Sequence, residues 1–103
     1  MDPQLKKGLL DACILASLVT GESYGYKIIS DTKNYIEISE STLYPILKRL
    51  MEANYLTSES REHNGRLRKY YRITTLGRGK LLEYKESFKQ VNKIYEFVKE
   101  SAE

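Results

Sequence analysis

The sequence predicts an α+β fold that is mostly helical, and three features of its pattern support this prediction. The first is an amphipathic helix pattern over residues 39–56 that follows a shorter helical segment, as in a helix-turn-helix. The second is the Asn64-Gly65 dipeptide between two strand-like runs, which is a strong hairpin signal. The third is a long helical pattern after Thr75 with one apolar seam. Together they predict a winged helix-turn-helix followed by a C-terminal dimerisation helix.

Length and composition place the chain among single-domain globular proteins. Its 103 residues, 41% hydrophobic and 30% charged, suffice for one domain with a buried core. No run of about 18 apolar residues is present, so no transmembrane helix is expected. The apolar N-terminal run is interrupted by Asp11 and no cleavage site follows, which argues against a signal peptide. The single cysteine, Cys13, fits a reducing compartment, and we expect a cytoplasmic protein.

The first third of the chain predicts two helices and a short strand. Residues 5–19 are apolar on most sides, and Pro3 stands where a helix can begin. Such a helix must be covered by more than one neighbour. Residues 23–33 predict a second, shorter helix with Ser23 as a candidate N-cap. The alternation of apolar and polar residues at 35–38 predicts a strand.

Residues 39–56 predict the helix that matters most. The apolar positions fall at spacings of three and four, with Ser39 or Ser41 as N-cap and Asn54 as the residue that ends the helix. The buried stripe comprises Leu43, Ile46 or Leu47, Leu50 and Met51. The opposite face carries Ser41, Thr42, Tyr44, Lys48 and Arg49. Short hydroxyls, an amphipathic ring and two cations suit a groove of phosphates and base edges; the alternative is an ordinary solvated face.

The next segment predicts a basic hairpin. Residues 56–62 and 67–74 are strand-like, and residues 63–66 form the turn. Residues 61–80 contain seven basic residues and one acidic residue, a net charge of +6 against +3 for the whole chain. Such a segment is expected of a phosphate-binding element. The alternative is a solvated basic hairpin without a partner.

Residues 75–103 predict one long helix with Thr74 or Thr75 as its cap. The seam comprises Leu81, Tyr84, Phe88, Val91, Tyr95 and Val98, at heptad-like spacing. We expect this helix to mediate dimerisation together with Leu5 and Leu9 of the first helix. The alternative is a helix folded back onto its own core.

The sequence offers no residue pattern for catalysis. It contains no zinc-binding motif and no phosphate loop, since Gly77 and Gly79 lack the required spacing. His63 has no partner placed by a motif, and Cys13 lies in an apolar segment as a small core residue does. We therefore expect neither an enzyme nor a bound cofactor or metal.

Three stretches resemble the PadR family of transcriptional regulators: YGYKI at 24–28, SESTLYPILKRL at 39–50, and NGRLRKYYRITTLGR at 64–78. The resemblance spans residues 5–80, and the short C-terminus is similar to that of the smaller members. It implies a homodimeric winged-helix repressor that binds a palindromic operator in double-stranded DNA. Release by a small molecule or a stress signal is common in the family.

The resemblance also implies which residues contact DNA. The helix at 39–54 would enter the major groove, and the wing at 62–69 would reach the backbone or a minor groove. The residues so implied are Ser41, Thr42, Tyr44 and Lys48 in the helix, Tyr26 and Lys27 near the backbone, and Asn64, Gly65, Arg66, Arg68 and Lys69 in the wing. Some members bind flat aromatic drugs between tryptophans, which this chain lacks. Tyr84, Phe88 and Tyr95 either line an effector pocket or are plain core, so an effector stays open.

These expectations divide the chain into a DNA-binding domain at 1–74 and a dimerisation helix at 75–103, which form one structural unit. Tyr24 and Tyr71 are expected in the core. The leading hypothesis is a sequence-specific DNA-binding repressor. The alternative is a winged-helix protein-interaction module that binds an acidic partner through its wing.

Overall fold

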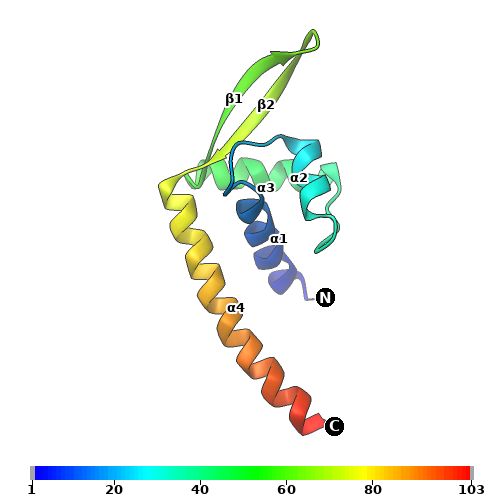
Figure 1. Cartoon of the computed structure of the whole chain (residues 1–103), viewed down its shortest axis with the longest axis vertical. Helices are drawn as coiled ribbons and strands as arrows, with labels where there is room; N and C mark the ends of the chain where they lie inside the picture. The colour runs from blue at the N-terminus through cyan, green and yellow to red at the C-terminus, as the bar shows by residue number, and fades with distance from the viewer. Residues whose placement is uncertain (1, 103) are drawn as a thin grey trace.

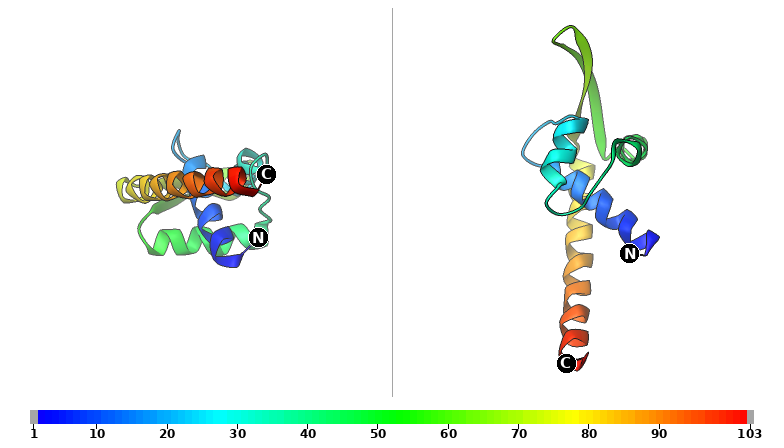
Figure 2. Two further views of the ribbon diagram at one scale, coloured as in Figure 1. Left: turned by 90° about the horizontal axis from the view of Figure 1, so that it is seen from below. Right: turned by 90° about the vertical axis from the view of Figure 1, so that its right-hand side faces the viewer.

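A computed structural model describes residues 2–102 and has four helices and one hairpin within them (Figure 1). The hairpin is a two-stranded antiparallel sheet. Three helices pack beside its base, while the hairpin tip and the C-terminal half of the last helix project to opposite ends, giving extents of 58 × 26 × 22 Å (Figure 2). The elements are α1 (Pro3–Ser17), α2 (Gly25–Thr32), α3 (Glu40–Glu52), β1 (Leu56–His63), β2 (Arg66–Ile73) and α4 (Thr75–Ala102). The predicted mostly helical fold with a wing is confirmed.

Helix α1 begins as the sequence predicts, with Pro3 in its first turn. The Asp2 carboxylate accepts hydrogen bonds from the backbone N–H groups of Gln4 (2.9 Å) and Leu5 (3.1 Å), so it caps the helix. The buried apolar residues of α1 belong to one core with residues of α2, α3 and the hairpin. That core comprises Leu10, Ile14, Leu15, Leu18, Ile28, Ile38, Leu43, Ile46, Leu47, Leu50, Leu56 and Tyr71.

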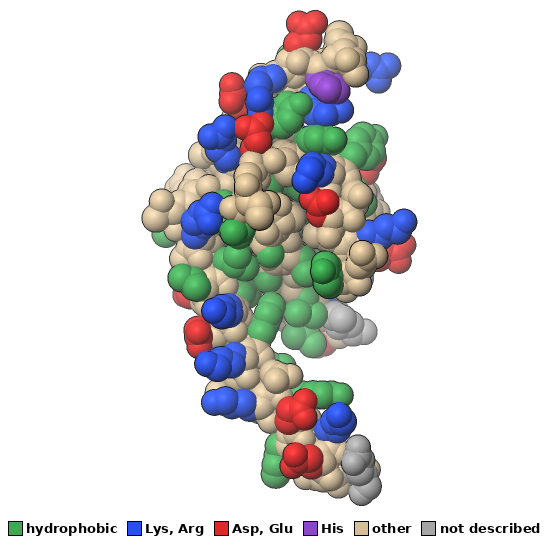
Figure 3. All heavy atoms as spheres, viewed as in Figure 1, with side chains coloured by type: hydrophobic (Ala, Val, Ile, Leu, Met, Phe, Trp, Pro, Cys, Tyr) green, Lys and Arg blue, Asp and Glu red, His purple; other side chains and the backbone are tan. Residues whose placement is uncertain are grey.

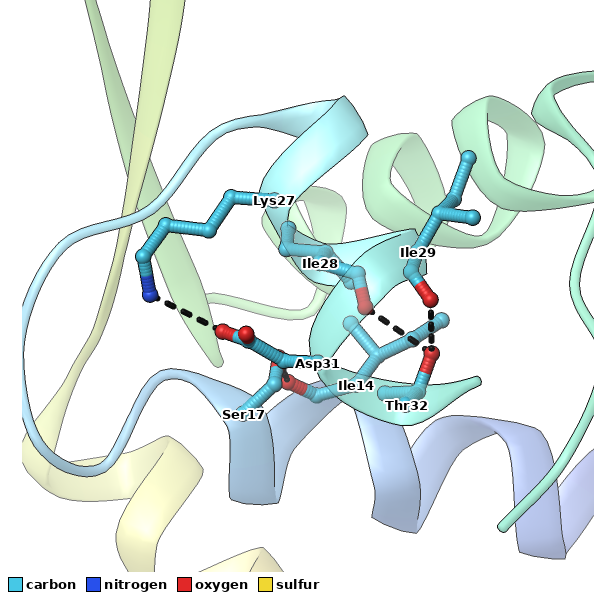
Figure 4. A network of polar contacts seen from close by, with 7 residues as sticks. All are labelled: Ile14, Ser17, Lys27, Ile28, Ile29, Asp31 and Thr32. Carbon is cyan, nitrogen blue, oxygen red and sulfur yellow. Dashed lines mark hydrogen bonds and ion pairs between the residues drawn. The ribbon is translucent and has the colours of Figure 1, made fainter. Parts of the chain in front are cut away.

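Helix α2 begins two residues later than expected, and Ser23 is not its cap. The backbone of Ser23 exchanges two hydrogen bonds with that of Tyr71, at 3.0 and 2.8 Å, and so forms a bridge to the hairpin. Because Ser23 is extended and its side chain buried, Tyr24 occupies the N-cap position instead. Near the other end, the Thr32 hydroxyl donates to the Ile28 carbonyl at 2.8 Å (Figure 4).

The predicted strand at 35–38 is wrong. The backbone N–H groups of Tyr35 and Ile36 donate to the Thr32 carbonyl, and residues 36–39 continue as irregular chain. No neighbouring strand offers a backbone ladder to this segment within residues 2–102, so its alternation only places Ile38 in the core. It is the connection of a helix-turn-helix.

Helix α3 and the hairpin follow the sequence closely. The Ser39 hydroxyl accepts from the Thr42 N–H (3.3 Å) and caps α3, and Asn54 has the left-handed φ of 64° beyond its end. The hairpin register runs from Leu56 opposite Ile73 to His63 opposite Arg66. Asn64 (φ 51°) and Gly65 (φ 80°) make the two-residue turn, as predicted.

Helix α4 starts at a tight junction with the end of β2. The Thr74 hydroxyl accepts from the Gly77 N–H at 2.9 Å, so Thr74 is the cap. A Cβ placed on Gly77 would lie 2.2 Å from the Tyr55 carbonyl oxygen, which leaves room only for glycine. The alternative of a helix folded back onto its own core holds in part: Leu81 and Tyr84 pack on that core, whereas Val91 is exposed.

Candidate nucleic-acid interface

A cleft of about 530 Å³ lies between the hairpin and the first turns of α2 and α3. Tyr71, which is buried as expected, forms part of its wall, and its burial raises the pKa of the Tyr71 hydroxyl. Six of the residues predicted to contact DNA line this one cleft: Tyr26, Tyr44, Asn64, Arg66, Arg68 and Lys69. Gly65 lies at the exposed tip beside them. The fold thus brings together parts of α2, α3 and the wing that are distant in sequence.

The basic residues of the hairpin divide into two groups. Arg72, near the base, and Arg61, which lies opposite Arg68 in the hairpin register, both form ion pairs with Glu22, the former at 2.7 Å. Toward the tip, Arg66, Arg68 and Lys69 form no ion pair with any residue of 2–102. The positive charge left without a carboxylate therefore faces the cleft. Figure 3 shows several Lys and Arg side chains over the hairpin, with acidic side chains among them.

Aromatic rings position part of this charge. The Arg68 guanidinium lies 3.9 Å from the centroid of the Tyr24 ring, and Tyr24 meets Tyr70 edge to face at 5.8 Å. Arg61 lies 3.9 Å from the Tyr70 centroid on the same face of the hairpin. Tyr24 is therefore a half-buried platform that holds Arg68 at the cleft wall, a role that sequence reasoning missed. The sequence signal that was available is the set Arg66, Arg68, Tyr70 and Arg72 on one face of β2, which does not point to Tyr24.

The face of α3 that was expected to contact DNA is exposed at Ser41, Thr42, Tyr44 and Lys48. The Ser39 hydroxyl lies 3.0 Å from that of Ser41 and 3.1 Å from that of Thr42. Tyr44 lies over α2: a Cβ on Gly25 would be 2.3 Å from the Tyr44 hydroxyl oxygen. Glycine at this position thus determines where the Tyr44 ring lies.

Tyr26 and Lys27, from the start of α2, differ in their surroundings. Tyr26 is 66% exposed in the cleft, and a hydrogen bond with Glu40, together with the charge of that carboxylate, raises the pKa of Tyr26. Lys27 is exposed and pairs with Asp31 at 2.9 Å, one turn along the helix (Figure 4). Exposed pairs of this kind are weak, so Lys27 can exchange Asp31 for a phosphate.

Arg49 does not belong to the open face of α3, contrary to the sequence prediction. Its guanidinium donates two hydrogen bonds to the Asp11 carboxylate, at 2.9 and 2.7 Å, and Asp11 is buried in α1. The pair raises the pKa of Arg49, with the hydrogen bond to Asp11 as the main cause. The Tyr84 hydroxyl donates to the same carboxylate at 3.3 Å. Burial raises the pKa of Tyr84, and Asp11 raises it further.

A second surface of interest is apolar and lies between α1 and α4. Six residues of the predicted dimer interface line one groove of about 620 Å³: Leu5, Leu9, Tyr84, Phe88, Val91 and Tyr95. Leu81 lines an adjoining hollow beside Cys13, and Val98 is exposed further along α4. Burial raises the pKa of the Cys13 thiol, which disfavours the reactive thiolate. Four further exposed apolar residues of α4, Leu76, Leu82, Ile94 and Phe97, were missed because only one heptad seam was followed.

Residues 2–102 hold no group of three or more metal-ligating side chains. None of their helices has the length and apolar character to cross a membrane.

A helix-turn-helix with a basic hairpin beside an exposed helix face defines a class, the winged-helix DNA-binding proteins. Residues 14–83 match the transcriptional regulator PadR-like family. A protein of Lysinibacillus sphaericus is 33% identical over 102 residues, with 94% of each chain covered.

Solved structures agree with this match. A Streptococcus mutans protein is 38% identical with a TM-score of 0.82, and the match covers 91% of this chain and 89% of that one. A PadR-like transcription factor from Bacteroides fragilis is 35% identical with a TM-score of 0.79, and the match covers 92% and 94%. The chain belongs to the PadR-like family of transcriptional regulators. It is accordingly a regulator rather than an enzyme.

Proposed function

We propose that this protein is a repressor that binds a palindromic operator as a homodimer in the cytoplasm. Residues 39–54 would lie in the major groove, and the wing at 62–69 would contact the backbone or a minor groove. One observation is the main support: Arg66, Arg68 and Lys69 face the cleft without a carboxylate, whereas Arg61 and Arg72 both pair with Glu22. An unneutralised basic cleft beside an exposed polar helix face is complementary to duplex DNA.

The proposed contacts fall into two sets. Phosphates would be bound by Lys27, Lys48, Arg66, Arg68 and Lys69, while Thr42, Tyr44 and Ser41 would read base edges. Tyr26, Asn64 and Gly65 would lie against the backbone near these contacts. The first set supplies affinity for any sequence, and the second supplies the preference for one operator.

The homodimer is supported by the apolar surface of α4. Tyr95 and Val98 are 56% and 55% exposed, on a helix that extends beyond the rest of the chain (Figure 1). Residues that large and apolar are commonly covered in an interface. We therefore assign DNA binding to residues 1–74 and dimerisation to residues 75–103 together with Leu5 and Leu9.

The DNA contacts are tested by fluorescence anisotropy with a duplex covering the promoter of the protein's own gene and a scrambled duplex of equal length. We expect the wild type to prefer the promoter and to weaken steeply with salt. Lys69→Ala should lower the slope of log affinity against log salt by about 1. Lys99→Ala, which removes the same charge from the far end of α4, should leave the slope unchanged. An unchanged slope in Lys69→Ala would argue against a phosphate contact by the wing.

Dimerisation is tested by sedimentation equilibrium. The wild type should have the mass of two 12.0 kDa chains, and Val91→Asp, in the groove, should shift the mass toward one chain. Leu82→Asp is the control, because Leu82 is equally exposed on α4 but does not line the groove. A wild-type monomer that binds an acidic protein and no DNA would instead indicate an interaction module. Higher reporter expression from the promoter without the protein would establish repression.

A further inference from the structure

Asp11 is the one acidic residue inside the apolar helix α1, and it is only 3% exposed. A carboxylate that is removed from water is tolerated only when charged or hydrogen-bonding groups surround it. Its two oxygens are satisfied by side chains from two other helices, Arg49 of α3 and Tyr84 of α4. A single buried group therefore joins three helices.

The contact between Asp11 and α3 is bidentate. Arg49 donates through both terminal nitrogens, at 2.9 and 2.7 Å, and this bidentate geometry fixes the guanidinium plane as well as its distance. Arg49 directly follows Lys48 and lies just over one turn beyond Tyr44, both of which are proposed to contact DNA. A rotation or shift of α3 about its axis would break this pair.

The contact with α4 is made from within the apolar groove. The Tyr84 ring lines both the groove and the hollow beside Cys13, and it packs 6.0 Å from the Phe88 ring. Its hydroxyl reaches inward to Asp11, at 3.3 Å. The Tyr84 ring is therefore linked to the Asp11 carboxylate through this hydrogen bond. A surface that covers the groove and shifts the ring also shifts the hydrogen bond.

We propose that Asp11 is a positioning residue that couples the α1–α4 groove to the orientation of helix α3, through its hydrogen bond from Tyr84 and its ion pair with Arg49. The inference rests on the proposed function and adds the route by which packing at α4 affects operator choice. The network includes no wing residue, and Arg66, Arg68 and Lys69 lie outside it. Loosening it should therefore impair the reading of base sequence and leave the binding of phosphates intact.

The test measures the ratio of promoter affinity to scrambled-duplex affinity, because a merely structural role would not change this ratio in the folded protein. Tyr84→Phe keeps the ring in the groove and removes only the hydroxyl. Tyr95→Phe is its control, because Tyr95 also lines the groove but its hydroxyl makes no hydrogen bond within residues 2–102. Asp11→Asn keeps the shape of the side chain and removes its charge.

We expect Tyr84→Phe to lower the ratio about fivefold and Asp11→Asn about tenfold, with scrambled-duplex affinity and dimer mass unchanged. The double variant, Asp11→Asn with Tyr84→Phe, should lower the affinity ratio no more than Asp11→Asn alone, because both changes act on one carboxylate. If Asp11→Asn does not fold, Tyr84→Phe against Tyr95→Phe decides the question alone.

An unchanged ratio in Tyr84→Phe would overturn the inference while the proposed function stands. Equal losses in Tyr84→Phe and Tyr95→Phe would do the same, since they would show a general effect of the groove. A wild type with no preference for the promoter would instead refute the proposed function and this inference with it.

Discussion

Gly25, the first residue of α2, lies directly under the ring of Tyr44. A Cβ placed on it would be 2.3 Å from the Tyr44 hydroxyl oxygen, 3.0 Å from Cζ and 3.4 Å from Cε1, whereas ordinary contacts begin at about 3.4 Å. In Gly25→Ala the end of the ring must therefore move by about 1 Å. Tyr44 is 44% exposed, so it has open solvent to move into.

The fold should tolerate this change. Gly25 does not have a positive φ, so alanine fits the backbone, and it reduces the conformational freedom of the unfolded chain. That effect stabilises by about 0.4–1 kcal/mol, and the outward movement of an exposed ring offsets part of it. We expect the free energy of unfolding in urea to stay equal or to rise by up to about 1 kcal/mol.

Recognition should not tolerate it. If Tyr44 reads a base edge, a displacement of about 1 Å removes a contact that contributes about 1–3 kcal/mol to discrimination, which corresponds to a loss of about 5-fold to 150-fold in promoter affinity. Affinity for a scrambled duplex should stay the same, because the wing cations are untouched. Tyr44→Phe in the Gly25→Ala background removes the atom that clashes most and should restore the ring position in part.

Anisotropy titrations with both duplexes, alongside urea unfolding, measure these effects. A large loss of stability would show that the Tyr44 ring cannot move aside. An unchanged promoter affinity would show that the position of Tyr44 does not matter for recognition. Either result would refute the reasoning.

Three other variants test separate parts of the fold. In a thermal melt, Gly77→Ala should destabilise the fold by about 1–3 kcal/mol, because its Cβ would meet the Tyr55 carbonyl. Gly79→Ala is the control and should be neutral or stabilising, because a Cβ there has nothing within 4 Å. Arg49→Ala leaves the buried Asp11 carboxylate without its cation and with only the Tyr84 hydroxyl as a partner, so it should cost about 3 kcal/mol in urea unfolding, more than Asp11→Asn; equal losses would contradict this asymmetry. Tyr24→Leu removes the ring on which Arg68 lies and should weaken binding to the promoter and to the scrambled duplex alike, by a factor of about two to five. A loss of promoter affinity alone would contradict this.

The local elements were predictable because their signals are local. Ser39 and Thr74 are caps, and the Asn64-Gly65 turn sets the hairpin register, since each depends on residues a few positions away. The strand at 35–38 failed for the opposite reason. A strand needs a partner, and alternation in one segment does not say whether a partner exists.

Side-chain partners were the part that the sequence could not supply. Arg49 looked like a cation of the open face because its partner Asp11 lies 38 positions away. A carboxylate in an otherwise apolar helix did signal that some partner was needed, but not which one. Likewise the net charge of the hairpin did not reveal that Arg61 and Arg72 pair with Glu22, whereas Arg66, Arg68 and Lys69 have no carboxylate partner within residues 2–102.

Hydroxyl-radical footprinting of the protein on the promoter of its own gene tests the central claim most directly. Two recognition helices related by two-fold symmetry should protect two half-sites about one helical turn apart, roughly 34 Å, with further protection outside them from the wings. Lys69→Ala should weaken that outer protection, whereas Lys99→Ala should leave it unchanged. A symmetric footprint of this kind is the predicted result. A single asymmetric patch, or none at protein concentrations that saturate a scrambled duplex, would contradict a dimeric, operator-specific regulator.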